Sequence, residues 1–219
     1  MRRVLVTAGP TRAYIDAVRY IANSSSGAMG RAVAEAFLGA GWEVSYLYGE
    51  GALRPRLAHG DRLIERCVGQ LSELAPTLSD ELAARPADMV VHAMAVLDYA
   101  PEDAFPGKLD SDAETLTLRL VRTPKMVDLI REAAPRALLV PFKLGAGWPE
   151  SRLVEEAASL ARRYKAAFVV ANDLSAIKGG KHPTLFVSPE GRVLLRRRTR
   201  EETAAAILAM ADDLLKGHA

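Results

Sequence analysis

The segment "SSSGAMG" (Ser24 to Gly30) combines small side chains that suit the binding of an anion. Its hydroxyls and backbone amides can donate hydrogen bonds, and its glycines let a ligand approach the backbone closely. An alanine-rich stretch with helical spacing follows, so the segment lies at a helix start, where the helix dipole favours phosphate. A serine that only caps the helix is an equally good interpretation, because both the dinucleotide-binding and the P-loop glycine patterns are absent.

Polar residues also follow four of the predicted buried strands. The four strand ends read "TAGPTR", "HAMAVLDY", "PFKL" and "VVAND". In a mostly parallel sheet, ligands bind beyond the carboxyl ends of the strands, so tips of this kind are what an active-site rim requires. Polar loops follow strands in any protein, so one tip alone does not distinguish an active site from an ordinary loop. The four together favour a site.

The elements that must position these residues alternate between strand and helix. Apolar patterns predict strands over 4–8, 42–48, 61–68, 88–96, 115–121, 137–142 and 167–173, and a hairpin over 184–197. They predict helices over 27–40, 70–84, 124–134, 149–165 and 200–219. Pro76 interrupts the second of these helices, and Pro124 lies in the first turn of the third. This alternation is typical of an α/β, Rossmann-like fold, a mostly parallel sheet with helices on both faces. We expect one domain over residues 1–219, with a surface flap at about 97–113, where prolines and acids cluster.

Composition narrows the class of protein. A net charge of +2 gives no concentrated basic face, so we expect no nucleic-acid partner. The single cysteine, Cys67, provides no disulfide framework and fits a reducing cytoplasm. No signal peptide is recognisable, and no apolar run approaches the ~20 residues of a membrane span. We therefore expect a cytoplasmic protein without a membrane partner.

The motifs in order resemble a known enzyme family. The stretch "VLVTAGPTRAYIDAVRYIANSSSGAMG" is similar to the first motif of the phosphopantothenate–cysteine ligases, the phosphopantothenoylcysteine synthetases of coenzyme A biosynthesis. "HAMAVLDYAP", "GKLDSD", "LVRTPKMV", "PFKL" and "VVANDLS" resemble the later motifs of that family, in the same order, over residues 3–195. Their forms look more like the stand-alone ligases than like the ligase half of bifunctional decarboxylase–ligases.

The resemblance implies an activity and its partners. Such a ligase joins 4'-phosphopantothenate to L-cysteine through an acyl-nucleotide intermediate, with CTP or ATP as co-substrate and Mg²⁺ accompanying the triphosphate. The sequence does not choose between the two nucleotides. Family members are homodimers, with the flap near the interface, and the substrate site can draw on both subunits.

The resemblance also implies roles for individual residues. Asn23, Lys108 and Arg19 are the expected catalytic residues, acting on the acyl group, the triphosphate, and a phosphate or carboxylate. Contacts with the nucleotide are expected from Gly9, Ser25, Ser26, Gly27, His92, Ala93, Met94, Asp98, Lys108, Pro124, Lys125, Met126, Val127, Phe142 and Arg163, and contacts with the substrate from Asn23, Ala95 and Asp98. No protein side chain is assigned to the metal.

Each of these side chains also has an ordinary structural interpretation. Asn23 can serve as a helix cap or in a turn, and Asp98 can form a turn. Lys108 can be a solvated loop lysine, and Phe142 can be a buried aromatic. For Arg19 a salt bridge to Asp16 is as good an interpretation as ligand binding.

Two departures from the family pattern leave alternatives open. Ser24 stands where the family commonly has histidine, and Ala28 where it has lysine, so less positive charge faces a ligand at this turn. The missing lysine is the best argument for a non-catalytic nucleotide-binding protein of the ligase fold. An NAD(P)-binding Rossmann oxidoreductase is the other alternative, but "TAGPTR" lacks the dinucleotide fingerprint and the second strand offers only Glu50 at its end.

Overall fold

The computed structural model describes residues 1–56, 60–110, 112 and 114–216. One eight-stranded sheet has the order β12-β11-β10-β9-β6-β1-β4-β5. The strands are β1 (Arg3–Ala8), β4 (Glu43–Gly49), β5 (Leu63–Val68), β6 (Met89–His92), β9 (Leu138–Gly145), β10 (Val169–Asp173), β11 (Thr184–Val187) and β12 (Val193–Arg197). The pairs from β5 to β10 are parallel, and β11 and β12 form the predicted hairpin at one edge. This sheet confirms the predicted Rossmann-like α/β fold.

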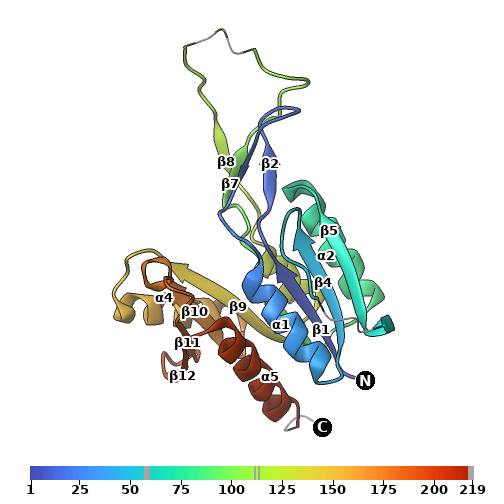
Figure 1. Cartoon of the computed structure of the whole chain (residues 1–219), viewed down its shortest axis with the longest axis vertical. Coiled ribbons are helices and arrows are strands. Elements are labelled where there is room, and N and C mark those ends of the chain that lie inside the picture. Colours follow the sequence, from blue (N-terminus) through green and yellow to red (C-terminus); the bar gives the residue numbers. More distant parts are fainter. Residues whose placement is uncertain (57–59, 111, 113, 217–219) are drawn as a thin grey trace.

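Helices cover both faces of the sheet, as the continuous apolar strands require. On one face of the sheet α1 (Ala28–Gly39) and α5 (Arg200–Lys216) lie side by side, with α1 next to β1 (Figure 1). On the other face lie α2 (Leu71–Ala84), α3 (Met126–Ala133) and α4 (Glu150–Tyr164). Two short 3-10 turns complete the elements, η1 (Gly60–Arg62) and η2 (Leu174–Ala176). Residues 217–219 of the predicted last helix lie outside the described residues.

Helix α1 packs tightly on the first strand because its third residue is a glycine. A Cβ atom added at Gly30 would lie 2.4 Å from the Cβ of Ala8. That separation is far below van der Waals contact, so only glycine permits this approach of helix to strand. The packing places the start of α1 directly beside the tip of β1.

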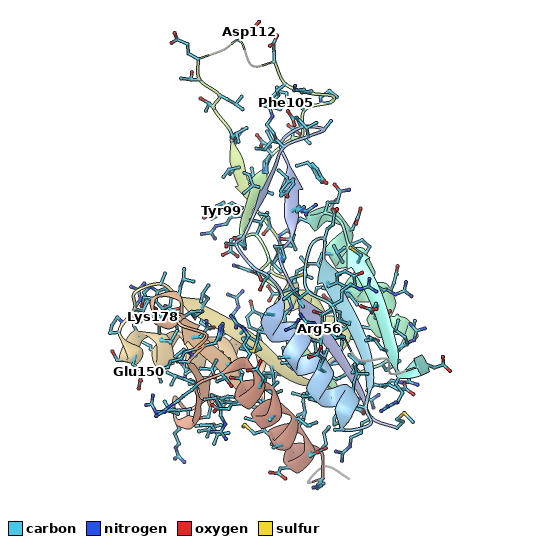
Figure 2. The ribbon with its side chains drawn as sticks, viewed as in Figure 1. Arg56, Tyr99, Phe105, Asp112, Glu150 and Lys178 are labelled. Carbon is cyan, nitrogen blue, oxygen red and sulfur yellow. The ribbon has the colours of Figure 1, made fainter. Side chains whose placement is uncertain are left out.

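Two short ribbons leave the main sheet and form an arm, defined here as residues 11–22 and 97–123. One ribbon pairs β2 (Arg12–Tyr14) with β3 (Tyr20–Ala22), and the other pairs β7 (Tyr99–Pro101) with β8 (Leu120–Arg122). The arm projects far beyond the sheet (Figure 1), with Tyr99 near its base and Phe105 and Asp112 on its outer part (Figure 2). The predicted flap is thus one side of this arm; its positions 111 and 113 lie outside the described residues.

Two predicted strands are shorter in the structure than in the sequence pattern. The strand predicted over 88–96 ends at His92, where its ladder with β9 stops, although the amides of Ala93 and Ala95 still donate to Thr7 and Gly9 on the side of β1. Of the strand predicted over 115–121, only Leu120 and Val121 fall in β8 (Leu120–Arg122). Its alternating pattern suits a half-buried strand, but on the arm Leu116 and Leu120 are exposed and no second sheet covers them.

Two helix predictions also need correction around proline. Helix α3 begins at Met126, so Pro124 precedes it and Lys125 is its N-cap residue. The chain before it is held extended, because the amide and hydroxyl of Thr123 donate to the carbonyl oxygens of Asp98 and Leu97. In contrast, α2 continues through Pro76 without a break.

Candidate functional site

The four polar strand tips lie on four neighbouring strands. The strands β10, β9, β6 and β1 are adjacent in the sheet and parallel, so "VVAND", "PFKL", "HAMAVLDY" and "TAGPTR" end at one edge. From β1 the chain first adds β4 and β5 on one side, and then crosses to β6 on the other. Such a reversal opens a crevice between the two central strands, which is where ligands bind in open α/β sheets.

The glycines of the first strand tip are fixed by a loop that the sequence did not single out. Gly9 and Gly27 both have positive φ angles, 80° and 72°. A Cβ atom at Gly9 would lie 2.3 Å from the Cβ of Ala52, in the loop after β4. The amide of Leu53 in that loop donates to the carbonyl oxygen of Ser26 at 2.9 Å. In the sequence, the two glycines of "YGEGA" are the feature that could have indicated this supporting loop.

No side chain caps α1, so the serine-cap interpretation is wrong. The N-cap residue is Gly27, and the hydroxyls of Ser25 and Ser26 accept only long contacts, 3.4 Å, from the amides of Gly27 and Ala28. The first helical hydrogen bond runs from the amide of Arg31 to the carbonyl oxygen of Gly27. The amides before Arg31 therefore have no partner within the helix and face the turn as donors for an anion.

Asn23 joins the serine turn to the tip of β6. Its side-chain amide donates to the carbonyl oxygens of Ala95 at 3.2 Å and Val96 at 3.0 Å. The side chain is exposed, and its amide oxygen accepts no hydrogen bond from any described residue. Neither a helix cap nor a turn explains these contacts. They fix Asn23 at the tip of β6 through its amide nitrogen and leave its amide oxygen available to a ligand.

The tip of β6 is supported from beneath by a buried histidine. The Nδ1 atom of His92 lies 2.7 Å from Oγ1 of Thr7. Burial lowers the pKa of His92 to about 4, so the ring is neutral near pH 7. Beside it, the amides of Ala93 and Ala95 donate to the carbonyl oxygens of Thr7 and Gly9. His92 thus lies below the rim, and two amides predicted near the ligand are already engaged.

Several of the remaining predicted nucleotide contacts lie where the arm meets the sheet. Nζ of Lys125 lies 2.5 Å from the carboxylate of Asp98, and both side chains are more than half exposed. Pro124 and Met126 line a cavity of about 370 Å³ at the base of the arm. Next to them Val127 is half-buried, and on β9 Phe142 is half-buried against the core beneath α1 and α5.

Lys108 does not lie with these residues. It is exposed on the outer part of the arm, between Phe105 and Asp112, which Figure 2 shows well beyond the sheet. No described carboxylate forms an ion pair with it. A ligand at the strand tips of the same chain is therefore separated from Lys108 by the length of the arm.

Arg19 is engaged on the arm as well. Its guanidinium lies 2.7 Å from Asp16 and donates to the carbonyl oxygen of Leu109 at 2.8 Å. The salt-bridge interpretation is thus present in the structure. β3 begins at Tyr20, directly after Arg19, so the chain between Arg19 and Asn23 is extended and not helical.

Arg163 is not brought to the site. It lies in the last turn of α4, 5.1 Å above the ring of Tyr164 and 3.9 Å from Asp128. Helix α4 connects two parallel strands and runs antiparallel to them, so its last turn lies towards their amino ends.

Glu50, the acid that the oxidoreductase alternative needs for a ribose, is engaged elsewhere. Its carboxylate forms an ion pair with Arg12 at 2.5 Å.

At the tip of β10, Asp173 holds the neighbouring loops together. The carboxylate of Asp173 accepts hydrogen bonds from the hydroxyl and amide of Ser175 and from the amides of Gly147 and Trp148. The Ser175 hydroxyl and these amides lower the pKa of Asp173 to about 2. This tip forms part of a separate cavity of about 420 Å³ between α4 and the β11–β12 hairpin. None of the predicted site residues lines that cavity.

Comparison with known proteins shows the family of this chain. The sequence pattern of the DNA/pantothenate metabolism flavoprotein C-terminal domain matches residues 1–214. The chain belongs to this family. A similar relative of the family is the Coenzyme A biosynthesis bifunctional protein CoaBC of Thermococcus kodakarensis, 35% identical over 203 residues, which cover 93% of this chain and 49% of that protein. The chain spans about half the length of the curated relatives it matches.

Solved structures of the family share the fold. The DNA/pantothenate metabolism flavoprotein of Streptococcus pneumoniae superimposes with a TM-score of 0.88 at 29% identity, covering 98% of this chain and all of that one. The C-terminal domain of a CoaBC protein gives a TM-score of 0.77 at 27% identity, covering 99% of this chain and 96% of that one.

In the part of this chain that the structure describes, no helix is long and apolar enough to cross a membrane.

Proposed function

We propose that this protein is a ligase that joins 4'-phosphopantothenate to L-cysteine, a step of coenzyme A biosynthesis. The observation that carries the proposal is the position of Asn23. Its amide group bridges to Ala95 and Val96 at the crevice between β1 and β6, beside the open amides of the serine turn. A cysteine amine and a phosphate bound at this point would meet one accepting amide oxygen and one anion-binding turn.

The proposed reaction has two steps. The carboxylate of 4'-phosphopantothenate attacks the α-phosphorus of CTP or ATP, which forms an acyl-nucleotide and releases pyrophosphate. The amine of cysteine then attacks the acyl carbon, forms the amide and releases the nucleoside monophosphate. Neither step needs an oxidant or a reductant, so the chain has mainly to bind, orient and neutralise charge.

The side chains at the sheet edge divide this work. Gly9 and the turn of Ser25, Ser26 and Gly27 would hold phosphate oxygens through backbone amides and hydroxyls. Asp98 would accept a hydrogen bond from a ribose hydroxyl, and Lys125, which pairs with it, would fix its orientation. The amide oxygen of Asn23 would accept a hydrogen bond from the amine of cysteine without titrating.

Magnesium would arrive with the triphosphate. Among the described residues, no group of three or more histidine, cysteine, aspartate or glutamate side chains lies together in a way that could hold a metal ion. Mg²⁺ commonly keeps waters and takes its other ligands from substrate phosphates. Its contribution when bound would be to offset phosphate charge.

The arm supports a further part of the proposal, a homodimer. It carries Lys108 away from the strand tips of its own chain, so the arm of a second copy is the simplest source of this lysine at the triphosphate (Figure 2). The arm also exposes large apolar side chains, with Tyr20, Tyr99 and Leu120 each more than 40% exposed. Apolar groups gathered on a projecting element favour an interface between subunits.

One assay tests the activity. The purified protein is incubated with 4'-phosphopantothenate, cysteine and Mg²⁺, with CTP and ATP in separate reactions, and pyrophosphate and the amide product are followed. We expect amide formation that depends on cysteine with at least one nucleotide. Pyrophosphate release without amide, or no turnover with either nucleotide, would contradict the proposal; nucleotide binding without turnover would instead favour the non-catalytic alternative.

A mixing experiment tests the shared site. Lys108→Ala and Asn23→Asp chains are combined under conditions that exchange subunits. If Lys108 acts on its partner's site, mixed dimers contain one intact site, and about a quarter of the wild-type activity should return after random exchange. No recovery would overturn the shared site, and a monomer by sedimentation velocity would overturn the dimer; both results would leave the chemistry untouched.

A further inference from the structure

The carboxylate of Asp16 is fully buried, although it lies in the turn at the outer end of the β2–β3 ribbon. It accepts hydrogen bonds from the amides of Val18 at 2.9 Å and Arg19 at 2.7 Å, and from Nε of Arg19 at 2.9 Å. These three donors belong to its own turn. A fourth donor, the amide of Leu109 at 3.0 Å, comes from the other side of the arm.

Further contacts tie the same two segments together. The amide of Ala17 donates to the carbonyl oxygen of Gly107, and the amide of Phe105 donates to that of Ile15, both at 2.9 Å. The guanidinium of Arg19 donates to the carbonyl oxygen of Leu109. Segment 15–19 therefore holds segment 105–109 at three successive points, and these include both chain neighbours of Lys108.

Lys108 itself takes no part in these contacts. Its side chain is exposed, and no described residue forms an ion pair or hydrogen bond with it. The backbone on either side is fixed while the ammonium group is left free. This is the arrangement that a charged group needs if it is to meet a ligand in a defined position.

We propose that Asp16 is a positioning residue for Lys108, with Arg19 as its partner. This inference rests on the proposed function, in which Lys108 meets the triphosphate. The buried carboxylate is satisfied only when segment 105–109 is docked, because one of its donors is the Leu109 amide. Undocking would leave a buried charge short of a hydrogen bond, so the docked state of the flap is favoured.

The contacts of Asp16 separate this role from general stability. Asp16 belongs to neither of the two hydrophobic clusters that pack on the faces of the sheet. Its partners all lie on the arm, within 15–19 and 105–109. Loss of the carboxylate should therefore release the flap without unfolding the sheet.

Native-state proteolysis tests docking without reference to activity. Trypsin cleaves after lysine, and the Lys108–Leu109 bond carries the amide that Asp16 holds. Cleavage at this bond, followed by mass spectrometry, should quicken roughly tenfold or more in Asp16→Asn. Asp103→Asn removes the same charge from an exposed position of the same flap and should cleave at the wild-type rate. Arg19→Lys, which keeps the charge but loses the forked contacts, should give an intermediate rate.

Kinetics test the consequence for Lys108. Asp16→Asn should raise KM for the nucleotide or lower kcat in the same proportion as Lys108→Ala does. The double variant should be no worse than Lys108→Ala alone, because a residue that acts through another has no effect once that other is gone. Asp103→Asn should match the wild type.

The outcomes distinguish the two proposals. Unchanged tryptic cleavage in both Asp16→Asn and Arg19→Lys would overturn the positioning role, whatever the activity. Faster cleavage with additive losses in the double variant would show that Asp16 does not act through Lys108, and would also overturn it. A wild type without ligase activity would refute the proposed function, while the cleavage rates would still report whether Asp16 docks the flap.

Discussion

The side-chain amide of Asn23 donates to the carbonyl oxygen of Val96 at 3.0 Å, across a separation of 73 residues. This bond joins the end of the first ribbon to the loop after β6, at the reversal point of the sheet. It also explains why an amide stands here, because a carboxylate would face two carbonyl oxygens, those of Ala95 and Val96, with no hydrogen to share.

Asn23→Asp should therefore slow amide formation by about a hundredfold while changing nucleotide binding only a few-fold. The lost contacts orient the acyl site, whereas the phosphate-facing amides of the serine turn remain. Single-turnover kinetics and nucleotide titration measure the two effects separately. Ser24→Ala, an exposed neighbour, is the matched control. Equal loss of binding and turnover in Asn23→Asp would contradict the role given to Asn23.

The Asp98–Lys125 pair gives a second prediction. Lys125→Ala should raise KM for the nucleotide about fivefold to twentyfold, because Asp98 loses the partner that orients it for the ribose. Its thermal unfolding should hardly change, since both side chains are largely exposed and such pairs contribute little stability. Arg163→Ala removes a cation outside the site and should leave KM for the nucleotide within twofold of the wild-type value. A rise in KM comparable to that of Lys125→Ala would show that Arg163 does contact the nucleotide.

Helix α1 contains a matched pair of glycines for a stability measurement. Gly30→Ala should lower the free energy of unfolding by about 1–3 kcal/mol, because the new methyl group overlaps Ala8 on β1. Gly39→Ala, in the last turn of the same helix, meets no atom within 4 Å and should raise it by roughly 0.5–1 kcal/mol through helix propensity. Urea denaturation measures both. If Gly30→Ala raised the free energy of unfolding as Gly39→Ala does, the contact between helix and strand would not be tight.

Acid should destabilise the protein through its buried histidine. Burial lowers the pKa of His92 to about 4, whereas in the unfolded chain it is near the ordinary value of 6.5. The unfolded state therefore takes up a proton first, and the free energy of unfolding falls as pH drops from about 6.5 to about 4, by roughly 2 kcal/mol at pH 5 for one such group. Above pH 6.5 this contribution is fully present.

Urea denaturation at pH 7.5 and pH 5 measures this loss. His92→Gln should lose less stability between the two pH values than the wild type. Burial and the neighbouring Arg200 also lower the pKa of His182 to about 4, so His182→Gln should reduce the loss in the same sense. An unchanged difference in His92→Gln would show that His92 takes up its proton equally in the folded and unfolded states, which would contradict the prediction.

The fold was predictable from the sequence because its signals are local. The apolar runs of β1, β9 and β10 and the helical spacing of α1 lie within single segments, and each segment forms the predicted element. Predictions failed where a distant partner decides the local structure. Thr115 to Arg119 alternate like a strand but have no neighbouring sheet, and the strand predicted over 88–96 stops at His92, where its ladder with β9 ends.

The sequence by itself determined which residue types are available for the proposed chemistry: an asparagine, a glycine–serine turn, an aspartate after β6 and a lysine in a flap. Tertiary structure alone decided which of them meet. It joined Asn23 to Val96 and Asp98 to Lys125, and it placed Lys108 on an arm and Arg163 at the far end of α4. The reason is physical. Residue type and spacing act over a few positions of the chain, whereas the contact of Asn23 with Val96 and that of the Asp16 carboxylate with Leu109 join segments 70 to 100 residues apart.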